Sequence, residues 1–255
     1  MKDAVADTFV IAQRNLRRIP RAPDLLISFT VQPIMFILLF AYVFGGAIET
    51  PGYDDYIDFL MPGIVVQAIS FGGFVTAIGL SSDLEKGLID RFRSLPMSRA
   101  AVLAGRTLAD VATNLLQLTV LVVVGLLIGF TFDANVLEIV AGFALMLLFG
   151  YAFSWVFAWC ALVASSGESA QAIGFILIFP LSFASSAFVP VESMPDWLQV
   201  FAEINPFTTL TDALRALWVG APAGDDVWLA VLWCVGLTAV FATLSVARYR
   251  RAVTR

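Results

Sequence analysis

Six long runs of apolar residues alternate along the chain with short clusters of charged residues, proline and glycine. The runs cover roughly residues 25–47, 57–82, 107–130, 138–164, 170–189 and 227–247. A helix that crosses the ~30 Å hydrocarbon core of a bilayer needs about 20 mostly apolar residues, and each run meets that length. The pattern therefore predicts an all-α membrane protein with six transmembrane helices, which form one transmembrane domain over residues 1–255.

Composition supports lipid as the solvent for most side chains. Hydrophobic residues make up 60% of the chain and charged residues only 14%. Soluble domains average about 45–50% apolar and about 25% charged residues. A chain of this length cannot hide so much apolar surface in a water-soluble globule, because small globules keep much of their surface wet.

The basic residues predict the orientation of the six spans. Fourteen of the fifteen lysines and arginines fall before the first span, between the second and third, or after the sixth, and only Arg215 falls on the other side. Cytoplasmic loops carry an excess of Lys and Arg. We therefore expect both termini in the cytoplasm and the spans in the inner membrane of a bacterial or archaeal cell.

The segment before the first span has an amphipathic pattern over residues 3–19. Val5, Phe9, Ala12, Leu16 and Ile19 share one helical stripe, and charged residues occupy the opposite face. This pattern is typical of a helix that lies in the membrane interface. The alternative is a frayed basic tail.

The loop between the second and third spans, residues 83–106, is the long inner connection. It combines charged residues with apolar ones at helical spacing, and Pro96 predicts the end of a helix. A short charged helix with an apolar edge suits docking to a cytoplasmic partner. A solvated connector whose cations only fix topology is an equally good interpretation of the composition.

Between the fifth and sixth spans the chain predicts two short helices on the outer side. Ser193 to Asp196 resembles a capped helix start, and Asn205-Pro206 resembles a second one. After it, Phe207, Leu210, Leu214 and Leu217 form an apolar stripe. Helices lying in or re-entering the outer leaflet fit this pattern, and Trp197 and Trp218 suit the membrane interface.

The chain lacks the residues that common enzyme mechanisms need. It has no histidine, hence no HExxH zinc motif and no histidine base for a serine hydrolase. Its only lysines are Lys2 and Lys86, and neither belongs to a GxxxxGK[ST] loop. We expect no enzyme activity, no metal and no cofactor in this chain, so the energy for any transport must come from elsewhere.

Several polar residues fall inside the predicted spans. Asp110, Asn114 and Gln117 share one face of the third span, and Gln32, Gln67 and others lie in the remaining spans. Polar residues in lipid most often hydrogen-bond to neighbouring helices. The other interpretation is that some of them line a substrate path.

Several segments together resemble the membrane subunit of type-2 ABC exporters, in the branch of the daunorubicin/doxorubicin-resistance permeases. The most specific is Asp83-Leu84-Glu85-Lys86-Gly87 followed by Asp90-Arg91-Phe92-Arg93-Ser94-Leu95-Pro96. The others are Gln32-Pro33-Ile34-Met35-Phe36, Phe44-Gly45-Gly46-Ala47-Ile48, Phe59-Leu60-Met61-Pro62-Gly63-Ile64, Phe179-Pro180-Leu181, Met194-Pro195-Asp196-Trp197-Leu198 and Asn205-Pro206.

The resemblance implies a six-helix permease subunit with three additional features. Residues 3–19 would be an elbow helix, the inner loop a coupling helix, and the segment after Val189 a pair of outer re-entrant helices. The coupling contacts would come from Glu85, Lys86, Gly87, Leu88, Asp90, Arg91, Phe92 and Arg93. We expect Gln32, Phe36, Gln67 and Ser182 to line the substrate path.

The same resemblance implies the partners. Two cytoplasmic ABC ATPase subunits would bind the ATP and Mg²⁺, and a second permease copy or homologue would pair with this chain in the lipid. The expected function is outward movement of a small hydrophobic or amphipathic compound: a drug, an antibiotic or a lipid. A permease for a lipid-linked glycan or envelope lipid, and a non-transporting membrane scaffold, are the alternatives; nothing indicates nucleic-acid binding.

Overall fold

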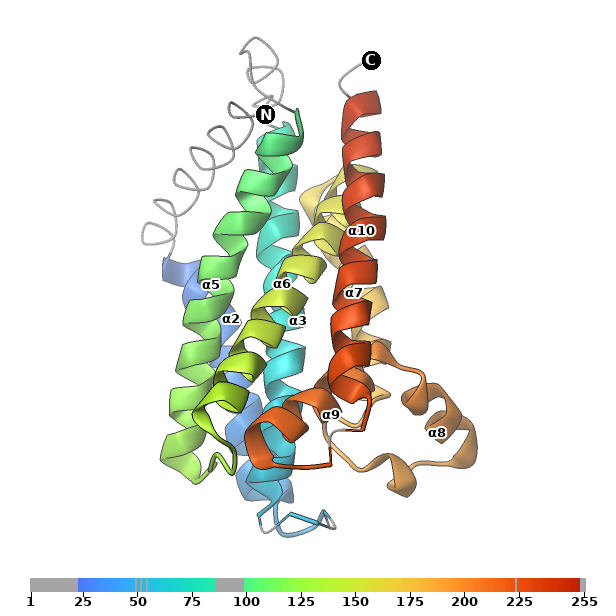
Figure 1. The fold of residues 1–255 in the computed structure, drawn as a ribbon. Coiled ribbons are helices and arrows are strands. Elements are labelled where there is room, and N and C mark those ends of the chain that lie inside the picture. The colour runs from blue at the N-terminus through green and yellow to red at the C-terminus, as the bar shows by residue number, and fades with distance from the viewer. Residues whose placement is uncertain are drawn as a thin grey trace.

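The computed structural model describes residues 23–48, 50, 52–53, 55–85, 99–222 and 224–252, and every regular element among them is a helix. The predicted elbow helix over residues 3–19 lies outside this part of the chain. The long helices run side by side, and successive ones run in opposite directions (Figure 1). Their bounds are α2 (Pro23–Leu39) continued by the π-helical turn η2 (Phe40–Phe44), α3 (Tyr56–Glu85), α5 (Arg99–Ile128), α6 (Val136–Val163), α7 (Gly167–Phe183) and α10 (Asp226–Ala252).

Four helical segments are long and apolar enough to cross a membrane: Tyr56–Asp83, Ala104–Ile128, Val136–Val163 and Asp226–Tyr249. They coincide with the second, third, fourth and sixth predicted spans. The first and fifth predicted spans coincide with shorter apolar helices, Val31–Phe44 and Gly167–Phe183, in the described residues. The fifth helix ends at Phe183, six residues before the end of its apolar run at Val189.

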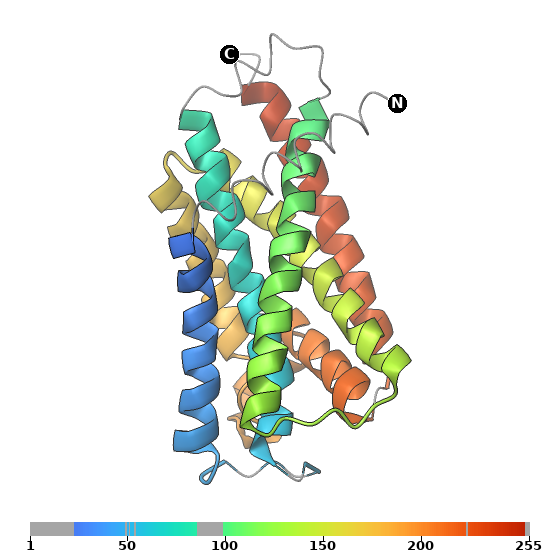
Figure 2. The same cartoon turned by 90° about the vertical axis from the view of Figure 1, so that its left-hand side faces the viewer.

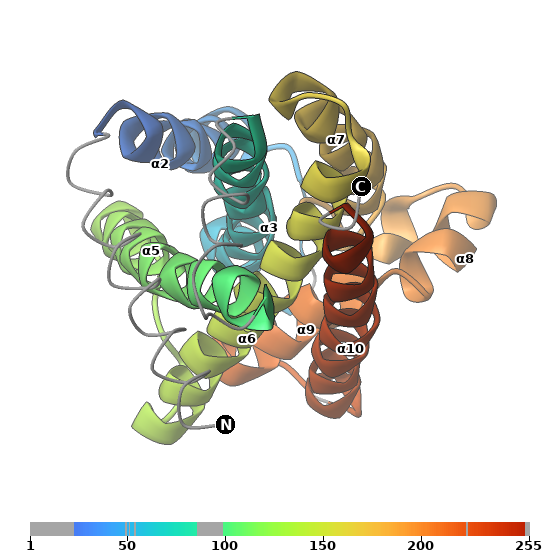
Figure 3. The ribbon, with the colours of Figure 1, turned by 90° about the horizontal axis from the view of Figure 1, so that it is seen from above.

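Three short helices lie at one end of the bundle, away from the end where α3 stops and α5 starts (Figures 1 and 2). They are η3 (Val191–Ser193), α8 (Asp196–Glu203) and α9 (Pro206–Val219). Helix α9 packs against α3, α6 and α10, whereas α8 projects to the side of the bundle (Figure 3).

The sequence placed the start of α9 correctly and the start of α8 incorrectly. The Asn205 side chain accepts a hydrogen bond from the Phe207 amide, and Pro206 is the first helical residue. Before α8, by contrast, Ser193 Oγ donates to the Pro190 carbonyl, and Pro195 occupies the N-cap without a side-chain hydrogen bond. The predicted serine cap is therefore wrong, because a competing local turn takes the hydroxyl group.

Helix α3 occupies the middle of the bundle. It contacts α2, α5, α6, α7 and α9. Of its most apolar stretch of residues, 72% is buried, whereas the corresponding share in α10 is 17%. Glycines allow this close packing: at Gly73 of α3 and Gly174 of α7, an added Cβ would lie 2.1 Å and 2.3 Å from the ring of Phe157. Phe157 itself is fully buried, so aromatic side chains fill the interior of the subunit.

Trp218 is part of this interior, which corrects the expectation that it lies at the membrane interface. Its side chain is completely buried, and its indole Nε1 donates to the Ile139 carbonyl at 3.3 Å. The ring packs on Phe130, Phe132 and Phe143. Trp197, the other predicted interface residue, is 74% exposed on α8.

We expect a substitution at Gly142 to destabilise the fold through Trp218. A Cβ at Gly142 would lie 2.2 Å from the indole Nε1, and a buried ring cannot move away as a flexible chain end can. Gly142→Ala should therefore cost about 1–3 kcal/mol, the usual range for overpacking a core. Thermal unfolding of the detergent-solubilised protein, followed by tryptophan fluorescence, measures the change.

The matched control is Gly236→Ala. Gly236 lies in α10 with no atom near its missing Cβ, and helical alanine is about 0.5–1 kcal/mol more favourable than glycine. The control should leave the unfolding temperature equal or slightly raised. Equal destabilisation by both variants would contradict the packing role of Gly142.

Candidate functional site

The predicted coupling residues lie at and beyond the end of α3. Glu85 is the last residue of this helix, and Lys86, Gly87, Leu88, Asp90, Arg91, Phe92 and Arg93 lie outside the described residues. The two helices that lead into this loop are tied together. Arg106 of α5 forms a salt bridge with Asp83 of α3 at 3.1 Å and donates to the Val75 carbonyl at 3.3 Å.

Further into the bundle, two more hydrogen bonds join α3 and α5. Thr76 Oγ1 donates to Asp110 Oδ2 at 2.6 Å, and Gln117 Nε2 donates to the Ala68 carbonyl at 3.4 Å. Asn114 is buried, and its amide group lies against Gly72 and Gly150. The polar face predicted on this helix therefore contacts neighbouring helices.

The four predicted path residues do not form one cluster. Gln67 of α3 and Ser182 of α7 are both buried, and Gln67 Nε2 donates to Ser182 Oγ at 2.8 Å. Phe36 of α2 is half-buried, with its ring 5.9 Å from that of Phe40 and 6.4 Å from that of Phe188. Gln32 is exposed on α2, one turn before Phe36.

Two rows of phenylalanine flank this region on helices that both pack on α3. On α7, Phe175, Phe179 and Phe183 are between 38% and 47% exposed, and their successive ring centroids lie 4.9 Å and 4.5 Å apart. On α2 and η2, Phe40 lies 5.1 Å from Phe44. We call these two rows, Phe36, Phe40 and Phe44 with Phe175, Phe179 and Phe183, the aromatic face.

Phe188 joins the two rows. Its ring lies 4.8 Å from Phe40 and 5.1 Å from Phe183, and only 5% of the residue is exposed. Of the six phenylalanines in the two rows, only Phe36 was predicted from the sequence as a path residue, and Phe188 was not, although the spacing of four residues within each row is visible there. Aromatic rings bind apolar groups by burying apolar surface and bind cationic groups through cation–π contacts. This face therefore suits an amphipathic molecule.

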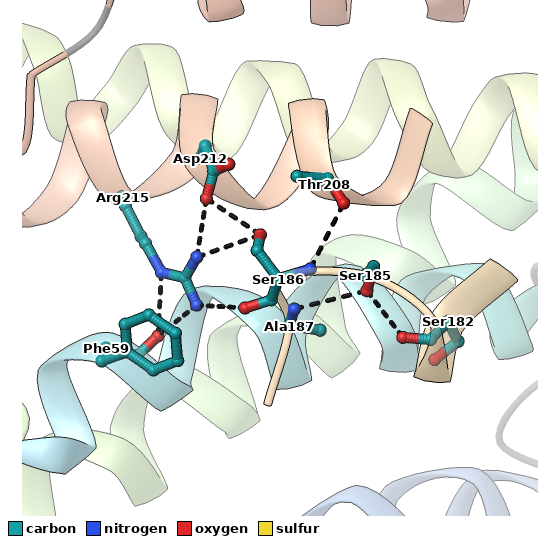
Figure 4. Close-up of polar contacts among 8 residues, drawn as sticks. All are labelled: Phe59, Ser182, Ser185, Ser186, Ala187, Thr208, Asp212 and Arg215. Carbon is teal, nitrogen blue, oxygen red and sulfur yellow. Dashed lines mark hydrogen bonds and ion pairs between the residues drawn. The ribbon is translucent and has the colours of Figure 1, made fainter. Parts of the chain in front are cut away.

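A buried arginine holds the end of the bundle next to the aromatic face (Figure 4). Arg215 of α9 is 3% exposed, and its Nε and Nη2 both donate to the Phe59 carbonyl of α3 at 3.0 Å. Nη1 donates to Asp212 Oδ1 at 2.6 Å and to Ser186 Oγ at 3.1 Å. The guanidinium carbon also lies 3.7 Å from the centroid of the Phe59 ring.

Burial next to Arg215 favours the neutral form of Tyr53. Burial raises the pKa of the Tyr53 phenol above its ordinary value, and the charge of Arg215 only partly offsets this rise. The Tyr53 ring meets that of Phe59 edge-on at 5.3 Å. Within the described residues, no group of three or more Cys, Asp or Glu side chains is arranged to hold a metal ion.

Comparison with known proteins assigns the chain to a family. A family model described as ABC-2 type transporter matches residues 6–219. The chain is 37% identical over 247 residues to the daunorubicin resistance ABC transporter permease protein DrrB1 of Streptomyces coeruleorubidus, covering 97% of this chain and 87% of the relative.

More distant relatives carry related names. The probable doxorubicin resistance ABC transporter permease protein DrrC of Mycobacterium tuberculosis is 26% identical over 250 residues, which cover 98% of this chain and 90% of the relative. The probable multidrug ABC transporter permease YbhR of Escherichia coli is 24% identical over 212 residues, which cover 78% of this chain and 54% of the relative. This chain therefore belongs to the ABC-2 type transporter family, as a multi-pass membrane permease subunit.

Proposed function

We propose that this chain is the membrane subunit of an ATP-driven exporter that moves a small hydrophobic or amphipathic compound, such as a drug or an antibiotic, out of the cell. The observation that carries the proposal is the aromatic face, an exposed array of rings with the Gln67–Ser182 amide and hydroxyl beside it. Membership of a permease family gives this surface its context, and the drug names of the relatives favour an amphipathic substrate.

The proposed topology has six spans within one permease domain over residues 1–255. The α2–η2 helix and α7 join the four longer apolar helices as the first and fifth spans, and the alternating directions of all six favour this count. The end of the bundle where α3 and α10 stop and α5 starts faces the cytoplasm of a bacterial or archaeal cell, because the lysines and arginines cluster there. Helices α8 and α9 then lie in the outer leaflet.

We propose that two permease subunits, identical or homologous, form the substrate path between them. Within the described residues, close-packed rings such as Phe149, Phe157 and Phe207 fill the interior of the subunit, so we place the path at its surface. The aromatic face combines exposed rings with the Gln67–Ser182 pair, and we assign it as the surface that a second copy would cover. Gln32, Phe36, Gln67 and Ser182 line or support this path.

Energy enters through two separate ATPase subunits that bind the ATP and Mg²⁺. They dock on the loop over residues 83–106, with Leu88 and Phe92 as apolar anchors and with Glu85, Lys86, Asp90, Arg91 and Arg93 as the charged rim. Gly87 would allow close backbone approach. The Asp83–Arg106 salt bridge at the base of this loop supports the assignment, because it joins α3 and α5 into one body that a docked partner can move.

The proposal predicts that an ABC ATPase co-purifies with this chain in mild detergent. Mass measurement should give two permease subunits for every two ATPase subunits, and an amphipathic drug should stimulate ATP hydrolysis. One permease per complex would contradict the shared path, and the absence of any ATPase would favour the scaffold alternative. Stimulation by a lipid-linked glycan alone would redirect the substrate assignment.

The topology is tested by thiol labelling in whole cells. Single cysteines at Asp54, Asp133 and Asp225 should react with a membrane-impermeant maleimide, because these positions lie between spans on the outer side. Cysteines at Ser94 and Thr254 should react only after the membrane is permeabilised. Labelling of Thr254→Cys in intact cells would overturn the orientation.

Truncating Phe92 should weaken ATPase association more than neutralising a rim charge. Phe92→Ala should lower the affinity by about tenfold, as expected for one buried anchor of an interface. Arg93→Gln is the matched control and should change it by less than about fivefold, since exposed ion pairs contribute roughly 0–1 kcal/mol. The measurement is ATPase co-purification at equal membrane abundance, and equal behaviour of both variants would remove Phe92 from the interface.

A further inference from the structure

We propose that residues 184–189, which we call the strap, close the outer end of the aromatic face, and that Arg215 is the positioning residue that holds the strap in place. This inference rests on the proposed function, because it assigns a gate to the proposed path. The strap connects the end of α7 at Phe183 to the η3–α8–α9 segment. It carries Phe188, the ring that joins the two aromatic rows.

The strap begins where α9 caps α7. Asn205 Nδ2 donates to the carbonyls of Leu181 and Ala184, both at 2.7 Å. The last carbonyls of a helix have no partner within the helix, so these two bonds end α7 and turn the chain. The same Asn205 caps the start of α9, and one side chain therefore fixes both helix ends.

Arg215 holds the middle of the strap. Its Nη2 donates to the Ser186 carbonyl at 2.7 Å, while the Ser186 hydroxyl donates to Asp212 Oδ1 at 2.9 Å (Figure 4). The Ser186 amide donates to Thr208 Oγ1 at 3.2 Å, also on α9. The N–H, C=O and hydroxyl groups of Ser186 are thus all bound to α9, and Arg215 links them to the Phe59 carbonyl of α3.

The other side of the strap lies directly on α3. At Gly63 an added Cβ would be 2.0 Å from the Ala187 carbonyl oxygen, so the two backbones are in contact. Tyr56 Oη donates to the Phe188 carbonyl at 2.9 Å. The strap is therefore held between α9 and the first turns of α3, and its Phe188 side chain points to the aromatic rows.

This arrangement can open without unfolding the bundle. The strap is not helical, and its attachments are hydrogen bonds to side chains of α9, the hydrogen bond from Tyr56 to the Phe188 carbonyl, and a backbone contact at Gly63. Asp212, the carboxylate partner of Arg215, is 35% exposed, so water can replace its contacts when the strap moves. A compound between the two aromatic rows must displace Phe188 to leave at this end, because that ring spans them.

The experiment measures how fast a thiol reagent reaches the path from outside, a readout that needs no transport of substrate. The permease–ATPase complex in intact cells carries the reporter Gln67→Cys, with Cys160 and Cys234 replaced by alanine, and is labelled with a membrane-impermeant maleimide. Gln67 lies one turn deeper along α3 than the Gly63 contact and is buried. The strap should make labelling of the reporter slow.

Three substitutions release the strap in different ways. Phe188→Ala removes the joining ring, Gly63→Ala pushes the Ala187 backbone away, and Arg215→Gln removes the charge that holds Ser186. Each should raise the labelling rate about tenfold, the change expected when charge-assisted hydrogen bonds or close packing of this kind are lost. Gly236→Ala, at an open helical position of α10, is the matched control and should leave the rate within about twofold.

Unchanged labelling in both Phe188→Ala and Gly63→Ala, at parental abundance and unfolding temperature, overturns the strap as the closure. If Arg215→Gln lowers the abundance or the unfolding temperature but leaves the labelling rate of the remaining folded protein unchanged, Arg215 only stabilises the fold, and its role as the positioning residue of the strap is wrong. Because the readout needs no transport, it stands apart from ATPase co-purification, whose failure would contradict the proposed function instead.

Discussion

The buried guanidinium group of Arg215 joins three segments that hydrophobic burial alone would not hold in register. A charge removed from water is costly unless it is fully paired, and here every bond goes to a specific partner on α9, on α3 or in the segment after α7. The cost of leaving any of these groups unpaired fixes the position of α9 across the end of the bundle. That position in turn fixes the end of α7, the first turns of α3 and the place of Phe188.

The rest of the bundle obeys a different constraint, which is close packing of rings on glycines. Phe157 lies against Gly73 and Gly174, and Trp218 lies against Gly142, so α3, α6, α7 and α9 approach closely. Small residues at helix contacts are the usual means of association in lipid, where neighbouring helices gain little from the hydrophobic effect. A filled interior leaves α2 and α7 with exposed rings at the surface, and the described part of this subunit is therefore open to a partner on that side.

Hydropathy and charge alone located the helices, because the length of an apolar run and the bias of Lys and Arg are properties of the chain itself. They failed where a tertiary contact decides the outcome. Arg215 stood out in the sequence as the one cation on the wrong side, but its burial depends on carbonyls more than 25 residues away in the chain, such as those of Phe59 and Ser186. For the same reason the apolar run that continues to Val189 was interpreted as helix, although Asn205 ends it at Phe183. Trp218 has the amphipathic side chain that is typical of a membrane interface, and only the packing of α9 on α6 places it inside.

The polar pairs between α3 and α5 have a consequence for how the protein is made. Asp110 is half-buried within its span, and an acidic side chain in an isolated apolar helix is costly to insert unless it is hydrogen-bonded. Thr76, its hydrogen-bond partner, and Arg106, one turn before it, belong to the α3–α5 hairpin itself. These two helices can therefore give Asp110 its hydrogen bond to Thr76 as soon as both have been synthesised, and Ser154 of α6 adds a second one when that helix packs. The α3–α5 hairpin is thus the natural first assembled unit in biogenesis, onto which the later helices pack.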